Sequence, residues 1–177
     1  MEDSIKQKIL GHFQKNTTDM ISVLKEVGES TYCKKINPDT WSVAEVVEHV
    51  ISVETGIMGN LQKLGATPSE TTMDDLASTE QIIERCLDRS ELVSAPDIFI
   101  PKGILTSKED AIAAFLQHRE NVQQFINETR LPLKNISFPH PRLGPLNGEN
   151  WLAFMVGHCY RHLEQVNIIK KGMTLTK

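Results

Sequence analysis

The stretch that decides the fold is Gly157-His158-Cys159-Tyr160-Arg161-His162-Leu163-Glu164-Gln165. His158 and His162 are four residues apart, so a helix would place both rings on one face, one turn from each other. Apolar residues continue that face at spacings of three and four, namely Trp151, Met155, Val166 and Ile169. Each imidazole in this core-facing stripe needs a partner, because an unsatisfied buried polar group costs about 1–3 kcal/mol. A metal ion shared by both rings would meet that need, and so would two separate hydrogen bonds.

The composition is that of a soluble globular protein, and we expect one domain over residues 1–177. The chain is 40% hydrophobic and 24% charged, with a formal net charge of −4. No basic patch stands out, so we expect no nucleic-acid partner. No apolar run approaches the ~20 residues that cross a bilayer, so we expect no membrane span.

The cysteines and the first residues predict a cytoplasmic protein. Cys33, Cys86 and Cys159 are odd in number and widely spaced, which fits free thiols in a reducing cytosol better than a disulfide framework. Residues 1–4 are acidic and polar and lack the apolar core of a signal peptide. We expect Cys86 and Cys159 to be packing residues, since neighbours in a helix such as His158 and Cys159 point ~100° apart.

Helical periodicity recurs along the rest of the chain. Apolar residues repeat near a period of 3.6 over residues 4–27, 43–64, 107–128 and 148–171, and more weakly over 73–89. Ser42 and Glu45 form a capping box before the second segment, and Asn147 is the expected cap of the last one. Gly28 and Gly172 are the expected stops of the first and last helices.

These segments predict an all-α fold, an antiparallel four-helix bundle with long crossover loops. Residues 91–105 and 129–147 are rich in proline and glycine and form the expected loops. No alternation with a period of two indicates a strand.

The other histidines differ in their expected surroundings. His49 falls on the flank of the second helical stripe, where it would face a neighbouring helix or be half-solvated, and the pattern slightly favours solvent. His12 should lie at the surface or at the boundary of the core, and His118 should face water. The sequence assigns no role to His140, which lies in the second long loop.

Several common catalytic signatures are absent from the sequence. It contains no Gly-x-x-x-x-Gly-Lys phosphate loop, no Gly-x-Gly-x-x-Gly and no His-Glu-x-x-His. A Glu-x-x-His pair is also missing, which disfavours a di-iron carboxylate bundle. The lack of Gly-x-Ser-x-Gly excludes a hydrolase nucleophile elbow.

Two segments together resemble the DinB/YfiT-like superfamily. The first is Trp41-Ser42-Val43-Ala44-Glu45-Val46-Val47-Glu48-His49, which is similar to the family's opening of helix two. The second begins at Gly144-Pro145-Leu146 and ends in the spacing His158-x-x-x-His162-x-x-Gln165, which is similar to the family's closing helix. The order and lengths of the helices also match over nearly the whole chain.

The resemblance implies an up-down-down-up bundle and a divalent metal ion held by His49, His158 and His162. Imidazole ligands suit zinc or nickel best, with iron, manganese and copper as alternatives. Each ligand should donate its second N–H to an outer partner, and the sequence offers four candidates, namely Glu45, Glu48, Glu54 and Gln165. Arg161 fits a position of the family, and an ion pair with an acid such as Glu164 or Glu149 would explain it equally well, so it is assigned no catalytic role.

Three functions agree with such a site. The resemblance favours a metal-dependent transferase that joins a low-molecular-weight thiol to an electrophilic small molecule, in a homodimer. A metal-dependent hydrolase with the same ligands is the second. A non-enzymatic metal-binding stress protein or structural dimer is the third, and it would show a closed site with four protein ligands.

Overall fold

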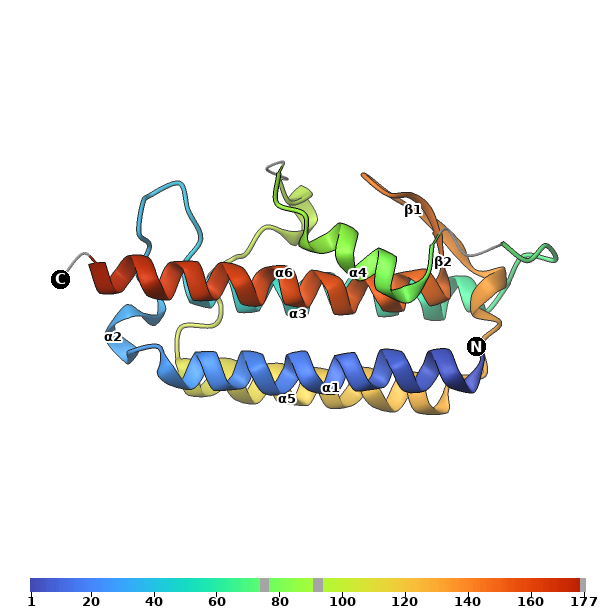
Figure 1. Ribbon diagram of the computed structural model, residues 1–177, viewed down its shortest axis with the longest axis horizontal. Coiled ribbons are helices and arrows are strands. Elements are labelled where there is room, and N and C mark those ends of the chain that lie inside the picture. The colour runs from blue at the N-terminus through green and yellow to red at the C-terminus, as the bar shows by residue number, and fades with distance from the viewer. Residues whose placement is uncertain (74–76, 91–93, 176–177) are drawn as a thin grey trace.

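A computed structural model describes residues 1–73, 77–90 and 94–175 of the chain. Four long helices in this part form a bundle of two layers (Figure 1): α1 (Asp3–Glu26), α3 (Val43–Gly65), α5 (Lys108–Glu128) and α6 (Gly148–Leu175). The helices α1 and α5 form one layer, and α3 and α6 form the other. The all-α bundle predicted from the sequence is confirmed.

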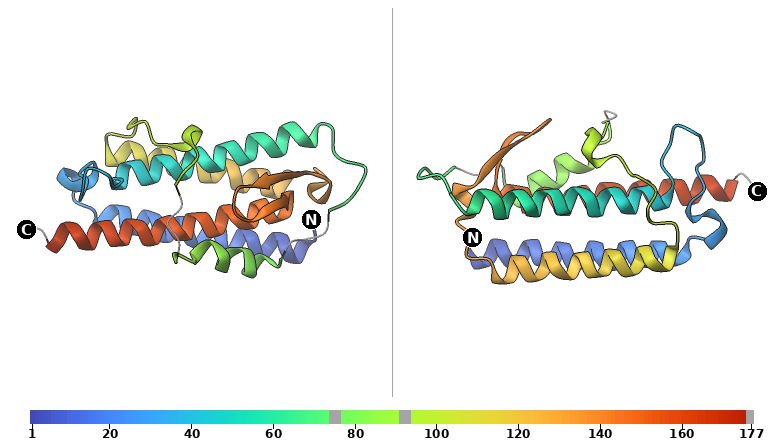
Figure 2. Two further views of the ribbon diagram at one scale, coloured as in Figure 1. Left: turned by 90° about the horizontal axis from the view of Figure 1, so that it is seen from above. Right: turned by 180° about the vertical axis from the view of Figure 1, so that it is seen from behind.

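The order of directions is up-down-down-up. The helices α1 and α6 run one way along the bundle, whereas α3 and α5 run the other way (Figures 1 and 2). Each long helix packs against two others, so that α3 has α5 and α6 as neighbours. Since α3 and α5 are parallel, the chain must return along the bundle between them, and the described residues of 66–73, 77–90 and 94–107 belong to this crossover.

Shorter elements lie in the connections. They are α2 (Glu29–Tyr32), α4 (Thr79–Leu87) and two 3-10 turns, η1 (Asp97–Phe99) and η2 (Leu133–Asn135). The helix α4 packs against α6 outside the four-helix bundle. Gly157 permits this contact, because a Cβ atom there would lie 2.8 Å from the Cβ atom of Cys86 and 2.9 Å from the Cα atom of Ile83.

The predicted first residues of α3 and α6 are confirmed, and in both helices a side chain caps the start. Ser42 Oγ accepts the backbone N–H of Glu45 at 3.2 Å, and the carboxylate of Glu45 accepts the N–H of Ser42 at 2.8 Å, as the capping box requires. Asn147 Oδ1 accepts the N–H of Asn150 at 2.9 Å at the start of α6. These polar contacts fix where α3 and α6 begin, and hence which faces of these helices meet.

Three predicted boundaries are wrong. Gly28 has a φ of −66° and precedes α2, so it is not a left-handed stop for α1, which ends at Glu26 with Val27 as its C-cap. The weak helix predicted over 73–89 begins only at Thr79, after a capping box of Ser78 and Gln81. Its predicted residues 74–76, like 91–93 of the predicted loop, lie outside the described residues. The helix α6 passes through Gly172.

The prediction that the chain has no strands is also wrong. Residues Ser137–His140 (β1) and Gly144–Asn147 (β2) form an antiparallel hairpin, with Phe138 paired to Leu146. The strands have four residues each and contain Pro139 and Pro145, which hides them from a search for alternating apolar residues. The ring of Phe138 stacks on Trp151 with centroids 4.3 Å apart, so the hairpin covers the start of α6.

The core has two apolar halves with polar groups between them. One half contains Phe13, Ile57 and Val122, and the other contains Met20, Val50 and Phe115. Between these positions along α1, α3 and α5 lie Asn16, Glu54 and Arg119, each at most 1% exposed.

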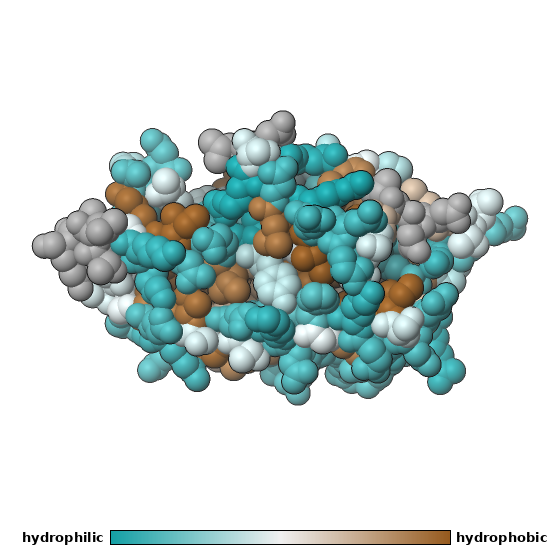
Figure 3. Space-filling model, viewed as in Figure 1, coloured by the Kyte–Doolittle hydropathy of each residue, from teal (hydrophilic) through white to brown (hydrophobic). Residues whose placement is uncertain are grey.

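The surface is mostly hydrophilic on the face shown in Figure 3, with apolar groups in separate patches.

No helix in the described part of the chain is long and apolar enough to span a bilayer.

Candidate metal centre

The helix α6 presents His158 and His162 on one face, as their spacing predicts. Their side chains are buried, with 9% and 8% of the residue surface exposed, and their ring centroids lie 4.4 Å apart. The two Nε2 atoms face each other at 3.1 Å. Two nitrogen atoms of neighbouring turns therefore point to the same small volume.

His49 adds a third ring from α3. Its ring centroid lies 5.1 Å from that of His158 and 4.8 Å from that of His162, and only 4% of the residue is exposed. The slight preference for a solvated His49 is therefore wrong, because α6 covers this flank of α3. One ligand atom from each histidine lies within 4.8 Å of the other two. No other described group of three His, Cys, Asp or Glu side chains meets this criterion.

Hydrogen bonds fix the outward nitrogen of two rings. The Nδ1 atom of His49 lies 2.8 Å from the carbonyl oxygen of Phe99, which can only accept, so Nδ1 carries the proton. The Nδ1 atom of His162 lies 2.8 Å from Oε1 of Gln165 and donates to it in the same way. In both neutral rings the lone pair is then on Nε2, the nitrogen available to a metal ion.

Burial keeps the three imidazoles neutral. It lowers the pKa of His49 below the usual range, against the opposing effect of the Phe99 carbonyl. It lowers the pKa of His162 to about 3, with the nearby His49 as the next cause. The pKa of His158 lies well below its ordinary value, because of burial first and the other histidines second. Neutral imidazole is the form that binds metals.

His158 has an unmet requirement. Its Nδ1 atom is buried and has no hydrogen-bond partner in the part of the chain that the structure describes. With Nε2 of His162 carrying a lone pair, the 3.1 Å approach of the two Nε2 atoms is stable only if a proton or a cation lies between them. A divalent cation would also take the lone pair of His49, so the donor set fits a metal ion.

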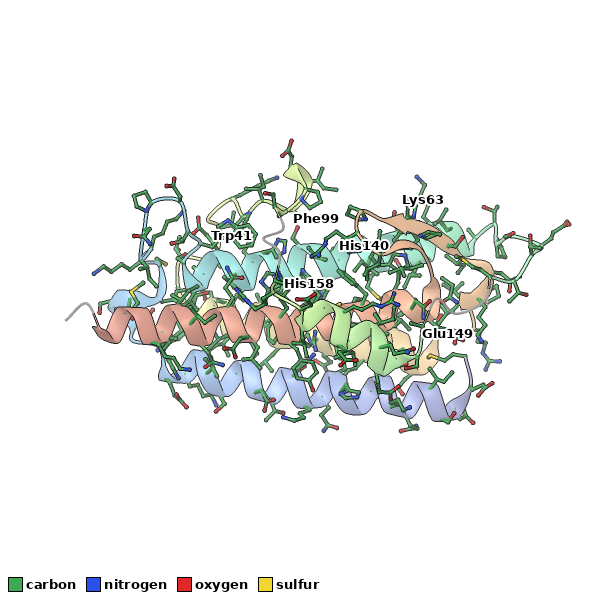
Figure 4. The ribbon with its side chains drawn as sticks, turned by 45° about the horizontal axis from the view of Figure 1, so that its top comes forward. Trp41, Lys63, Phe99, His140, Glu149 and His158 are labelled. Atoms are coloured by element: carbon green, nitrogen blue, oxygen red, sulfur yellow. The ribbon has the colours of Figure 1, made fainter. Side chains whose placement is uncertain are left out.

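Aromatic rings surround the three histidines. The ring centroid of Trp41 lies 4.7 Å from that of His49, and the ring centroid of Phe154 lies 5.4 Å from that of His158. Figure 4 shows Trp41, Phe99 and His158 approaching this region from three separate segments. His140 of β1 packs on Phe154 at 4.5 Å, and its Nδ1 atom accepts the N–H groups of residues 142 and 143. His140 therefore shapes the wall of the centre and ties the hairpin turn together.

Only one of the four expected outer partners contacts a ligand histidine in this structure, and it is Gln165. Glu45 caps α3 and pairs with Lys35. Glu48 accepts backbone N–H groups from the segment after η1. Glu54 pairs with His118 and Arg119 on α5. The carboxylates are near the centre in sequence, but α3 turns them to other faces.

Sequence reasoning missed two residues of this region. The carbonyl of Phe99 is a backbone group, which any residue offers, so no residue type marks it. His118 was expected to face water, but its Nε2 atom lies 2.9 Å from Glu54 and its side chain is 13% exposed. The buried Arg119 beside it was the available indication, since a charged residue inside an apolar stripe needs a partner.

Arg161 and the thiols have structural contacts. Arg161 donates to the carbonyl oxygens of Cys86 and Asp88 at the end of α4, while Glu149 pairs with the amino-terminal NH3⁺ group. Cys86 and Cys159 are buried, as predicted, and burial raises the pKa of each thiol to about 12. Neither thiol is available as a nucleophile at neutral pH.

Comparison with known proteins identifies the family and the fold. A family model described as the DinB superfamily matches residues 12–166. YfiT from Bacillus subtilis, described as a probable metal-dependent hydrolase with an unusual four-helix bundle topology, has a similar structure: the TM-score is 0.62 at 16% identity, over 98% of this chain and 90% of YfiT. TT2238, described as a four-helix bundle protein, gives a TM-score of 0.57 at 17% identity, over 92% of this chain and 98% of TT2238. No curated protein matches the sequence.

Proposed function

The chain belongs to the DinB superfamily, and from this premise we propose that it is a metal-dependent enzyme. In this proposal His49, His158 and His162 would hold one divalent ion, which would supply the positive charge that activates a small-molecule nucleophile. The observation that carries the proposal is the convergence of three neutral imidazoles, with their ligand atoms within 4.8 Å of one another.

The charge of the centre supports an anionic ligand. Three neutral imidazoles leave the charge of a divalent ion uncompensated, and no Asp or Glu belongs to the group formed by the described residues. A divalent ion such as zinc lowers the pKa of a bound water or thiol toward neutrality. The three histidines would fix the position of the ion, and the aromatic rings of Trp41 and Phe154 would limit access of bulk water to it.

The number of ligands supports catalysis over a purely structural site. Structural zinc sites are closed by four protein ligands, whereas catalytic sites use three and leave a position for water or substrate. The described residues supply three. We therefore place a non-enzymatic metal-binding role behind the two enzymatic ones.

We propose thiol transfer as the reaction, with a low-molecular-weight thiol as the nucleophile and an electrophilic small molecule as its acceptor. The chain's own thiols do not suit this role, because Cys86 and Cys159 are buried with a pKa of about 12. Burial also raises the pKa of the exposed Cys33, whose thiol donates to the carbonyl of Thr106. A soluble thiol would thus have to enter the centre. Hydrolysis is the second candidate, supported by the structural likeness to YfiT.

One experiment separates these functions. Protein loaded with zinc or nickel is incubated with a chromogenic electrophile, with and without cysteine, glutathione or coenzyme A, and in parallel with ester and amide substrates without thiol. Thiol transfer predicts metal-stimulated conjugation that His162→Ala loses. If the loaded protein instead hydrolyses esters or amides without added thiol, hydrolysis replaces thiol transfer as the proposed reaction. Metal binding with neither activity would overturn the proposal of an enzyme of either class.

A further inference from the structure

The segment Phe99–Ile104, which begins at the last residue of η1, is attached to α3 at two adjacent residues, Glu48 and His49. Both carboxylate oxygens of Glu48 accept backbone N–H groups: Oε1 accepts from Lys102 at 2.5 Å, and Oε2 from Ile104 at 2.9 Å. The next residue, His49, donates from Nδ1 to the carbonyl oxygen of Phe99 at 2.8 Å. One turn of α3 thus holds both a candidate metal ligand and the segment that orients it.

The backbone of the segment suits this contact. Gly103 has a φ of +72°, a left-handed conformation that side chains other than glycine rarely adopt. Successive N–H groups around a left-handed residue can turn to one side and form a binding place for an anion. Here the N–H groups on either side of Gly103 point to the carboxylate of Glu48.

Apolar burial contributes little to holding the segment. Ile98 is 76% exposed, Ile100 47% and Ile104 71%, so these side chains do not anchor it in the core. The one ring that packs is that of Phe99, which lies so close to Gly56 of α3 that a Cβ atom there would be 2.8 Å from it. The position of the segment therefore depends on the packing of Phe99 and on the polar contacts with Glu48 and His49.

Glu48 itself would be an unfavourable residue at this place without the segment. Only 7% of it is exposed, and a buried carboxylate is strongly disfavoured unless hydrogen bonds compensate the lost hydration. Two charge-assisted bonds to N–H groups do so. The carboxylate of Glu48 is stabilised by the N–H groups of the segment, and the segment is held by the same hydrogen bonds. Loss of the carboxylate should therefore release the Phe99 carbonyl from His49.

We infer that Glu48 is a positioning residue of the metal centre, acting through the Phe99–Ile104 segment on the ring of His49. The inference rests on the proposed function in that His49 is a ligand. Glu48 touches neither the ion nor the substrate in this account. It holds the acceptor that keeps the proton of His49 on Nδ1 and the lone pair of Nε2 directed to the centre.

The test compares Glu48→Gln with Glu45→Gln. Glutamine has nearly the shape of glutamate, but an NH2 group replaces one of the two oxygens, so a donor would face one of the two backbone N–H groups. Glu45 is one turn earlier on the same helix and contacts Ser42 and Lys35 rather than the segment. Gly103→Ala is the second variant, because it disturbs the same contact through the backbone without a steric clash within 4 Å.

Two measurements are made on each variant. The dissociation constant for Zn²⁺, determined by competition with a chromophoric chelator, should increase about 10–100-fold in Glu48→Gln and Gly103→Ala and stay unchanged in Glu45→Gln. Nitrogen NMR of the metal-free protein should show the Nδ1–H form of His49 in the wild type and a mixture of forms in the two segment variants.

The outcomes distinguish this inference from the proposed function. If wild-type protein binds no Zn²⁺, the proposed function fails, and the NMR comparison still decides whether Glu48 controls the tautomer of His49. If the wild type binds and Glu48→Gln binds equally well with an unchanged His49 tautomer, the inference is overturned. A lower Tm of metal-free Glu48→Gln with an unchanged dissociation constant would overturn it too, because that result indicates a structural role alone.

Discussion

The Nε2 atoms of His158 and His162 lie 3.1 Å apart in the middle of the bundle, one turn from each other on α6. In the neutral state the donation from His162 Nδ1 to Gln165 leaves a lone pair on His162 Nε2. A proton on Nε2 of His158 would bridge only these two rings, and in either case the Nδ1 atom of His158 has no hydrogen-bond partner among the described residues. A cation at this place would instead draw the lone pairs of all three histidines together.

Loss of the outer partner of His162 should weaken metal binding. In Gln165→Leu the Nδ1–H group of His162 loses its acceptor, and the ring is no longer held with Nε2 toward the centre. Loss of such a partner typically lowers metal affinity about 10–100-fold. Competition titration with a chelator measures this change. The control is Gln117→Leu, since Gln117 pairs with Asn121 on the exposed face of α5. Equal affinities in both variants would contradict the role of Gln165.

The metal-free protein should lose stability in acid through its buried histidines. The pKa of His162 is about 3 in the folded chain and about 6.5 in the unfolded chain. Between these values the unfolded state binds a proton that the folded state does not, so the free energy of unfolding decreases as the pH falls from about 6.5 toward 3. The slope is up to about 1.4 kcal/mol per pH unit for each such histidine.

Urea unfolding in the presence of a chelator at several pH values between 7 and 4 checks this expectation. His162→Gln should show a smaller slope than the wild type, because one titrating group is gone. An identical pH dependence of the two proteins would show that His162 titrates in the folded state as it does in the unfolded one.

Among the polar contacts inside the bundle, the ion pair of Glu54 and Arg119 should contribute strongly to the free energy of unfolding. Arg119 Nη1 donates to Glu54 Oε1 at 2.5 Å, and both side chains are at most 1% exposed. Arg119→Met keeps the volume but leaves a buried carboxylate, which should reduce the free energy of unfolding by about 3–5 kcal/mol. Lys15→Met, which breaks an exposed pair with Asp19, should cost at most about 1 kcal/mol. Similar losses for both variants in chemical denaturation would contradict this.

Two glycines in helices should respond in opposite directions to alanine. Gly157→Ala brings a methyl group against Cys86 and the backbone of Ile83 where α4 meets α6, which should destabilise the protein by about 1–3 kcal/mol. A Cβ atom at Gly11 of α1 would meet nothing within 4 Å, so Gly11→Ala should stabilise by up to about 1 kcal/mol. Thermal unfolding of the two variants measures the difference, and a stabilised Gly157→Ala would refute the close packing of α4.

The helices were predictable because their signals are local. The periodic stripe of α3 and its capping box at Ser42 and Glu45 lie in consecutive residues, and the structure reproduces them. The spacing of His158 and His162 likewise needs only the geometry of one helix. The hairpin of β1 and β2 escaped prediction because its pairing of Phe138 with Leu146 joins short segments containing prolines.

The surroundings of His49 could not be read from its own helix. Its flank position is buried because α6 and Phe99 cover it, and both come from distant parts of the chain. Periodicity therefore left it between core and solvent, and only the resemblance of Trp41–His49 to a known family indicated a ligand. The pairing of His118 with Glu54 depends in the same way on contact between two helices.

The most direct test of the central claim is X-ray absorption spectroscopy of the zinc-loaded protein. An open three-histidine centre predicts one zinc ion per chain with three imidazole nitrogen atoms at about 2.0–2.1 Å and at least one further ligand from solvent. His49→Ala, His158→Ala and His162→Ala should each remove one imidazole from the spectrum or abolish binding. A spectrum with fewer than three imidazoles, or a complete shell of four protein ligands, would contradict an open three-histidine centre.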